Sequence, residues 1–202
     1  MDPDAQVVTW APLRPGASVS LRSWKQRFLQ MNKSGAVQTT AIEDPPADGR
    51  LWERFTVVDA GDGLIALYNV EHRRFVRMCS GQVDGGGGQV DKLPADWRSE
   101  RFRVVDAGNG KIALHCGPER RFLRADAENR SLGVVDVART EKAADQLPPE
   151  SEGDWAAERF VVVPWVPVRP KQSDFNLTLD CSAFVHKRAY SRDVLAHRHG
   201  HM

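Results

Sequence analysis

Long apolar runs are absent from this sequence, since no stretch approaches the roughly 18 apolar residues that a membrane-spanning helix needs. The N-terminal residues, Met1 to Gln6, are acidic and also carry no apolar stretch. We therefore expect no transmembrane segment and no signal peptide. Both absences predict an intracellular, cytoplasmic location and leave an organelle open.

Cysteine and an excess of charge are lacking as well. The three cysteines, Cys79, Cys116 and Cys181, are odd in number and have no metal-binding spacing. They therefore predict reduced thiols packed in the protein rather than a disulfide framework. The net charge is only +1, whereas proteins that bind nucleic acid depend on clustered Lys and Arg. We expect no nucleic-acid partner.

Motifs of catalysis and metal binding are also missing. None of the six histidines stands in a His-Glu-x-x-His or Cys-x-x-Cys context, and no Gly-x-Ser-x-Gly elbow occurs. Four consecutive glycines at 85–88 lack the Lys-Ser/Thr of a phosphate-binding loop, so they indicate a flexible loop or a bulge. The sequence thus predicts a protein that is not an enzyme and has no metal or cofactor.

What the sequence does contain is a motif repeated three times. Each copy has an aliphatic strand ending in Leu, an Arg-Phe-aliphatic step and a closing Glu-Arg-Phe. The repeated Leu residues are Leu21, Leu67 and Leu114. The Phe residues of the second step lie 47 residues apart, at Phe28, Phe75 and Phe122. Those of the closing motif are Phe55, Phe102 and Phe160. Because all nine positions are repeated and apolar, we expect them to form a shared core.

Each copy holds four short runs rich in Val, Ile, Leu and Phe, which are typical of β-strands. Turn dipeptides separate them, at Ser34-Gly35, Asp62-Gly63 and Asn109-Gly110. The third strand is the weakest in each copy and is expected at 36–40, 89–92 and 132–135. The third copy is 11 residues longer, and we assign the extra residues to a surface loop at 140–154.

A unit of four short strands cannot bury its own apolar face, so the three copies must pack together. Closure around a pseudo-three-fold axis buries these faces and shields the sheet edges. The sequence therefore predicts an all-β fold, a single β-trefoil of three four-stranded repeats at residues 18–163. A lead-in at 1–17 precedes it, and a C-terminal tail at 164–202 follows it.

These motifs resemble the fascin-like β-trefoil family, which is also described as actin-crosslinking-like. The resemblance lies in Ile65-Ala66-Leu67, Arg74-Phe75-Val76 and Trp97 to Val105, and in their counterparts across the three copies. It implies a non-catalytic protein-binding scaffold or accessory subunit of a larger assembly. Actin binding or bundling at the cytoskeleton is the first alternative. A carbohydrate-binding module is the second, although the Gln-x-Trp pattern of sugar-binding trefoils is missing; its candidate aromatics are Trp10, Trp24 and Trp165.

Basic residues beside the repeated Phe of the second step form a first set of candidate partner-binding residues. Because successive residues of a strand face opposite sides, the Arg next to each buried Phe is expected to point outward. The set comprises Lys25, Arg27, Arg73, Arg74, Arg120 and Arg121. The alternative interpretation is a solvated face with local ion pairs.

The tail provides the second set, because it is the more basic part of the chain. Residues 164–202 carry six Lys or Arg against three Asp, together with several large apolar residues. Such a composition is too apolar for a simple flexible linker. We expect the tail to dock on a partner or on the trefoil, with a disordered tail as the alternative. The candidate contacts are Trp165, Phe175, Phe184, Lys187, Arg188, Tyr190 and Arg192; the oligomeric state stays open.

Overall fold

The computed structural model describes residues 11–40, 51–86, 92–125, 133–138, 140–152 and 154–165. These residues form thirteen strands and two short 3-10 helices, η1 (Ala11–Leu13) and η2 (Trp155–Glu158). None of the helices in this part of the chain is long and apolar enough to cross a membrane. All described residues belong to a compact unit spanning 1–167, and the second unit, 168–202, lies outside them.

The strands fall into three repeats of the same order. The first contains β1 (Ser18–Ser23), β2 (Leu29–Met31), β3 (Val37–Thr39) and β4 (Phe55–Gly61). The second contains β5 (Leu64–Asn69), β6 (Arg74–Phe75), β7 (Arg77–Cys79), β8 (Gln82–Asp84) and β9 (Phe102–Asp106). The third contains β10 (Lys111–Cys116), β11 (Arg121–Ala125), β12 (Gly133–Val137) and β13 (Phe160–Pro164). Strands β6 and β7 are two halves of one strand interrupted at Val76, so each repeat has the four strands expected.

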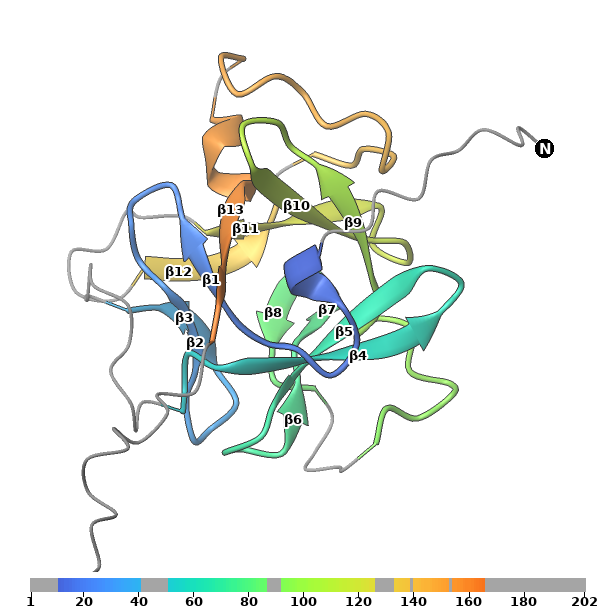
Figure 1. Ribbon diagram of the computed structural model, residues 1–202. Coiled ribbons are helices and arrows are strands. Elements are labelled where there is room, and N and C mark those ends of the chain that lie inside the picture. The colour runs from blue at the N-terminus through green and yellow to red at the C-terminus, as the bar shows by residue number, and fades with distance from the viewer. Residues whose placement is uncertain are drawn as a thin grey trace, which may run out of the picture. The chain divides into compact units, whose positions relative to one another are not determined.

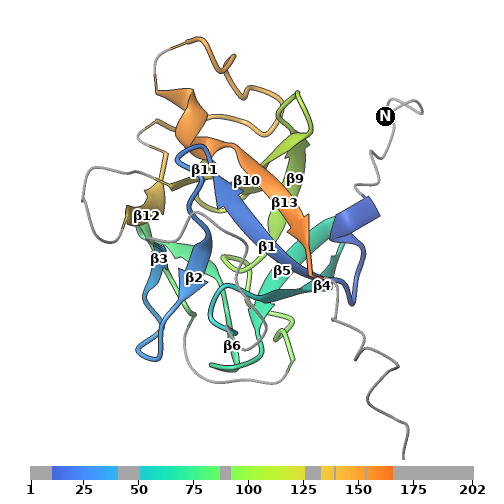
Figure 2. The ribbon, with the colours of Figure 1, turned by 60° about the vertical axis from the view of Figure 1, so that its left-hand side comes forward.

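The first and last strands of the repeats close into a six-stranded antiparallel barrel, in the order β1, β4, β5, β9, β10 and β13. Figure 2 shows β1 beside β13, the pairing that closes the ring. The remaining strands form three hairpins, which β12 joins by pairing with β3 and β8. The three repeats surround a common centre (Figure 1). The chain is therefore an all-β protein with a single β-trefoil.

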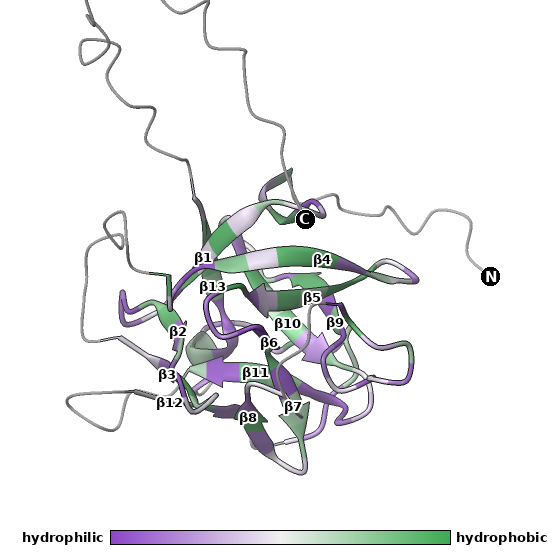
Figure 3. Cartoon of the chain, turned by 90° about the horizontal axis from the view of Figure 1, so that it is seen from below, coloured by the Kyte–Doolittle hydropathy of each residue, from purple (hydrophilic) through white to green (hydrophobic). Residues whose placement is uncertain are grey.

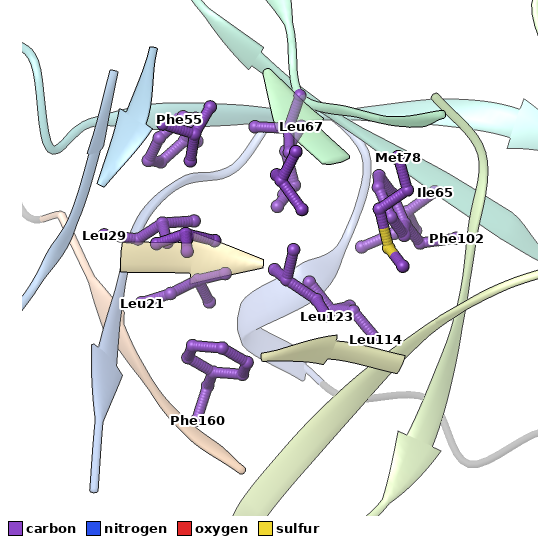
Figure 4. Packing of buried hydrophobic residues seen from close by; sticks show 14 of the residues in the cluster. Leu21, Leu29, Phe55, Ile65, Leu67, Met78, Phe102, Leu114, Leu123 and Phe160 are labelled. Carbon is purple, nitrogen blue, oxygen red and sulfur yellow. The ribbon is translucent and has the colours of Figure 1, made fainter. Parts of the chain in front are cut away.

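The core lies inside this barrel. It contains the repeated Leu and the closing Phe of every repeat, all fully buried: Leu21, Leu67, Leu114, Phe55, Phe102 and Phe160. Figure 4 shows their side chains pointing toward one another. The lead-in contributes to the same cluster through Leu13 of η1, a contribution that the repeat pattern alone does not predict. Hydrophobic residues run along strands such as β4, whereas the hairpin tip after β4 is hydrophilic (Figure 3).

The Phe residues of the second step are buried as expected, yet they lie outside the central core. Because side chains alternate along a strand, the next residue in each repeat points into the barrel instead. These inward residues are Leu29, Val76 and Leu123. Phe75 and Phe122 belong to two smaller clusters, partly covered by Trp97 and Trp155 respectively.

The register of pairing shows the three-fold equivalence. Each Phe of the second step lies opposite the residue that follows the repeated Leu: Arg22–Phe28, Tyr68–Phe75 and His115–Phe122. The rings of the last two pairs are 4.8 and 5.0 Å apart between centroids. Equivalent positions in the three repeats can therefore be compared residue by residue.

In the second repeat, β8 takes the place of the third strand, earlier than the predicted 89–92, of which 89–91 lie outside the described residues. Ser80 and Gly81 have φ angles of 53° and 74°, which makes them a two-residue type I′ turn that ends β7 and starts β8. Gly85 follows β8, and a Cβ there would lie 3.0 Å from the backbone of Gly35. This glycine therefore allows two hairpins to approach closely. The third strands β3 and β12 lie near their predicted places.

The extra residues of the third repeat form a loop, as expected, without a strand in their described part. Several contacts fasten the loop to the trefoil. Leu147 packs against the cluster of Phe122, and the Nζ of Lys111 lies 2.6 Å from the Oε1 of Glu150. The Nε2 of His115 lies 2.9 Å from the carbonyl oxygen of Lys142. The loop therefore lies beside β10, because Lys111 and His115 belong to that strand.

Candidate functional site

The structure does not gather the predicted basic residues into one patch. They occupy equivalent positions in three repeats, so they lie at three separate connections between the first and second strands. Lys25, Arg73 and Arg120 are exposed, whereas Arg27, Arg74 and Arg121 are half-buried. The Nη1 of Arg74 donates a hydrogen bond to the carbonyl of Gly86 over 3.3 Å.

Local contacts engage three other members of the same set. The Nζ of Lys25 lies 4.0 Å from the centroid of the Trp24 ring. The guanidinium group of Arg121 lies 3.9 Å from the carboxylate of Glu141, which Arg120 also approaches at 3.8 Å. The two contacts to Glu141 are local ion pairs of the kind that the alternative interpretation expects.

Of the predicted tail residues, only Trp165 is described. Its backbone N–H donates to the carbonyl of Ser18 over 2.8 Å. Its ring centroid lies 5.8 Å from the Cζ of Arg54. The other tail candidates lie outside the described residues: Phe175, Phe184, Lys187, Arg188, Tyr190 and Arg192.

The Arg of each closing motif connects two repeats. It reaches the residue that lies five positions after the closing Phe of the neighbouring repeat. The three pairs are Arg54–Trp165, Arg101–Ala60 and Arg159–Ala107. In the last two pairs the guanidinium group donates to a backbone carbonyl. These arginines therefore have a structural role at the junctions between repeats.

A groove with a volume of about 920 Å³ opens at the junction of the second and third repeats. Its charged and polar lining consists of Asp62, Arg98, Arg101, Arg103 and His115. The other lining residues are small or aliphatic: Ala60, Leu64, Ala95, Gly117, Pro118 and Ala144. Three arginines against one aspartate make the groove positively charged.

The three arginines of the groove differ in how they are held. The guanidinium group of Arg101 is held by backbone carbonyls. Its Nε donates to the carbonyl of Trp97 over 2.6 Å, and its Nη2 donates to the carbonyl of Pro94 over 3.1 Å. Arg98 and Arg103 are exposed. Among the described residues, neither guanidinium group has a hydrogen-bond or ion-pair partner. Two guanidinium groups are therefore available to a ligand.

His115 lies directly opposite Arg103 in the β9–β10 pairing, so the two side chains share a face of the sheet. Burial lowers the pKa of His115, and the positive charge of Arg103 lowers this pKa further. The hydrogen bond to the Lys142 carbonyl and the charge of Asp145 act in the opposite direction. With the net pKa below its ordinary value, His115 is neutral at pH 7, and its Nε2–H donates to Lys142.

Gly117 adds no side chain to the lining of the groove. Counting three residues from the repeated Leu, the first and second repeats place Trp24 and Val70 where the third has Gly117. Trp24 donates from its indole Nε1 to the carbonyl of Ala125 over 3.2 Å, and Val70 is 55% exposed. A Cβ at Gly117 would meet nothing within 4 Å, and its φ is not positive. The lack of a side chain, rather than a special backbone conformation, distinguishes this position of the groove lining from its counterparts in the other repeats.

The described cysteines match the expectation of packed thiols. Cys79 is half-buried and Cys116 is buried, and both are free. Burial raises the pKa of Cys116 to about 11, so this thiol stays protonated and unreactive at pH 7. Cys181 lies outside the described residues. Across the described ranges, no three His, Cys, Asp or Glu side chains gather into a metal-binding group.

Comparison with solved structures supports the fold. A cytolethal distending toxin structure from Haemophilus ducreyi has a TM-score of 0.55 and 11% identity, covering 74% of this chain and 84% of that chain. The SDF2-like protein from Arabidopsis thaliana has a TM-score of 0.52 and 10% identity, covering 74% and 93%. A β-trefoil called BEL has a TM-score of 0.53 and 12% identity, covering 75% and 94%.

No protein-family model matches the sequence, and no curated protein matches it either. At identities near one tenth, the structural likeness shows the β-trefoil fold alone. The fascin family in particular is not shown by these comparisons.

Proposed function

We propose that this protein is a non-catalytic binding module inside the cell, a scaffold or accessory subunit that receives an acidic part of a protein partner. The contact surface is the groove between the second and third repeats. The observation that supports this proposal is the pair of exposed arginines, Arg98 and Arg103, beside an unfilled groove.

The chemistry of these groups favours an acidic partner. A guanidinium group presents a planar fork of donors that fits a carboxylate with two parallel hydrogen bonds. Arg103 lies on β9 within the closed barrel. A group held on a closed barrel loses little backbone freedom on binding, which favours affinity. The positive groove also attracts an acidic surface during the encounter.

Affinity capture with matched variants tests the proposal. Gly117→Trp fills the groove with a side chain that the first repeat already carries at the equivalent position, Trp24. Val70→Trp makes the same change at the equivalent position of the second repeat. A partner that binds the wild type and Val70→Trp but not Gly117→Trp supports the proposal. Equal retention by both variants would falsify the assignment to this groove.

Actin is one candidate partner, suggested by the fascin-like resemblance of the repeat motifs. Co-sedimentation with actin filaments tests it. Pelleting that depends on the residue at position 117 supports actin as the partner. Absence of the wild-type protein from the filament pellet removes actin and leaves the binding module. To bundle filaments, a protein with a single trefoil needs a second actin-binding site or must form a dimer.

Carbohydrate binding has less support, because basic side chains already lie over two of its three candidate aromatic rings. Lys25 lies over the ring of Trp24, and Arg54 lies over the ring of Trp165. Trp10 lies outside the described residues. A glycan array on which the protein binds no sugar dismisses this alternative.

A further inference from the structure

We infer that the groove between the second and third repeats binds a short acidic peptide segment, with carboxylates on Arg98 and Arg103 and small aliphatic side chains on the groove walls. This inference rests on the proposed binding function and names the chemistry of its ligand.

The charge of the groove selects an anion. Arg98 comes from the segment before β9 and Arg103 from β9 itself, so the two guanidinium groups approach the groove from different elements. Asp62 is the one carboxylate in the described lining and lies at the tip of the β4–β5 hairpin. Arg101 is held by backbone carbonyls. A ligand with two carboxylates matches the two arginines that remain.

The walls distinguish a peptide from other anions. Single-stranded nucleic acids depend on stacking between bases and aromatic side chains, yet the described lining contains no Phe, Tyr or Trp. It presents instead the aliphatic surfaces of Ala60, Leu64, Ala95 and Ala144. These surfaces fit the side chains and Cα groups of a peptide. A bare phosphate or sulfate would leave them without contact.

The size of the groove agrees with a segment of several residues. Its volume of about 920 Å³ lies near the upper end of the roughly 300–1,000 Å³ typical of ligand sites. Gly117 keeps this volume free, whereas Trp24 or Val70 stands at the equivalent place in the other repeats. The groove thus combines open space, aliphatic walls and two free positive groups, all of which an acidic peptide uses.

The experiment is an NMR titration of the full chain with a capped octapeptide of alternating Glu and Ala. We expect amide shifts at Asp62, Arg103 and Gly117 and their neighbours, and an affinity that falls as salt rises. The capped octapeptide of alternating Gln and Ala has the same size without charge and should give no shifts there. Inorganic phosphate and a heparin hexasaccharide serve as competing anions.

Charge variants sharpen this test. The pair Arg98→Gln and Arg103→Gln should lower the affinity about tenfold or more, because hydrogen bonds between charged groups are each worth about that factor. The control pair Lys25→Gln and Lys33→Gln removes two exposed positive charges from the first repeat, away from the groove, and should change the affinity little. Gly117→Trp should abolish binding, and Val70→Trp should leave it unchanged. Unchanged amide spectra away from the substitution show that each variant is folded.

The possible failures are distinguishable. If the heparin fragment or phosphate shifts the groove amides and the Glu-Ala peptide does not, the ligand class is wrong. If the peptide binds equally to the Arg98/Arg103 pair variant and to the control pair, the two arginines are not its site. In both cases the proposed function survives when partner capture still depends on position 117. If partner capture does not depend on the residue at position 117, the proposed function is wrong as well.

Discussion

Two junctions of this molecule are built on the same backbone and present different surfaces. Thr56 pairs with Tyr68 across β4 and β5 as Arg103 pairs with His115 across β9 and β10. At three equivalent positions the first junction has Leu51, Thr56 and Val70, whereas the second has Arg98, Arg103 and Gly117. The residues at these positions are therefore uncharged at one junction, and at the other they are two arginines and a glycine that line the groove. The repeated residues build the fold, and the departures from the repeat build the candidate site.

The largest expected effect concerns the core that both junctions share. Phe55 and Phe102 are equivalent, fully buried and part of one cluster. Truncating either to Ala should lower the free energy of unfolding by about 3–5 kcal/mol, because each change leaves a cavity in the core. Urea unfolding of both variants measures this.

A surface variant provides the control for this pair. Arg103→Ala, next to Phe102 and exposed, should change the free energy of unfolding by no more than about 0.5 kcal/mol. A small effect of one Phe variant beside a large effect of the other would contradict a core shared equally by the repeats.

The three-fold core could be predicted from the sequence because its residues recur at fixed spacing. A Leu, an Arg-Phe step and a closing Phe in each copy were enough to indicate twelve strands and a closed trefoil. The prediction that the Phe residues of the second step share the central core was wrong, because each, like Phe28 before Leu29, is followed by another apolar residue and only pairing decides which of the two points inward. The third strand of the second repeat was predicted too late in the chain because the four glycines at 85–88 suggest a loop before it. The turn that sets its position is instead Ser80-Gly81.

The groove could not be predicted by looking for what the copies share. Arg98 and Arg103 flank the second closing motif, and their counterparts Leu51 and Thr56 are uncharged. This difference is visible in the sequence when the copies are compared for their departures. Gly117 departs in the same way from Trp24 and Val70, but only the structure shows that it lines a groove.

The second prediction compares the arginines that connect the repeats. Arg101 donates to several backbone carbonyls around the second junction. Its replacement by Ala leaves those carbonyls without a donor and should cost about 1–3 kcal/mol. Arg54, its counterpart, lies over the Trp165 ring, and Arg54→Ala should cost only about 0.5–1 kcal/mol. Urea unfolding compares them.

Arg98→Ala is the control here, since Arg98 is exposed and makes no such contacts among the described residues. It should leave the free energy of unfolding nearly unchanged. Equal losses for Arg101→Ala and Arg54→Ala would argue that the backbone hydrogen bonds of Arg101 contribute no more than the single ring contact of Arg54.

The third prediction uses pH. The pKa of His115 is lowered in the folded protein, first by burial. Its stabilising contribution is therefore complete above its unfolded pKa of about 6.5 and is lost as the pH falls through the lower folded pKa. His115→Tyr, which copies the equivalent Tyr68, should remove this loss. Urea unfolding at a series of pH values between 7.5 and 5 measures it.

Comparing variants isolates His115 from other titrating groups. Burial raises the pKa of Glu100 and of Glu158, so these carboxyl groups favour the folded state as the pH falls, opposite to His115. They are the same in both proteins and cancel in the difference. The reverse exchange, Tyr68→His, should introduce the acid-sensitive term at the first junction. Parallel pH profiles for the wild type and His115→Tyr would rule out the assigned role.

The smallest expected change in stability accompanies the most informative exchange, which rebuilds the second junction on the first. Leu51→Arg, Thr56→Arg and Val70→Gly together place two arginines and a glycine at positions equivalent to those of the groove. Because Leu51 and Val70 are exposed and Thr56 is half-buried, the fold should lose no more than about 1 kcal/mol, mainly from the new glycine. Urea unfolding checks that the triple variant remains folded.

The triple variant should also acquire a second site for the Glu-Ala peptide, seen by NMR as new shifts at β4 and β5. Its affinity should be lower than that of the natural groove, because Glu71 stands where the groove has Pro118 and repels carboxylates. Adding Glu71→Gln should then strengthen the second site and leave the first unchanged. If the triple variant gains no site even with Glu71→Gln, the side chains at these positions are insufficient to explain the difference between the two junctions.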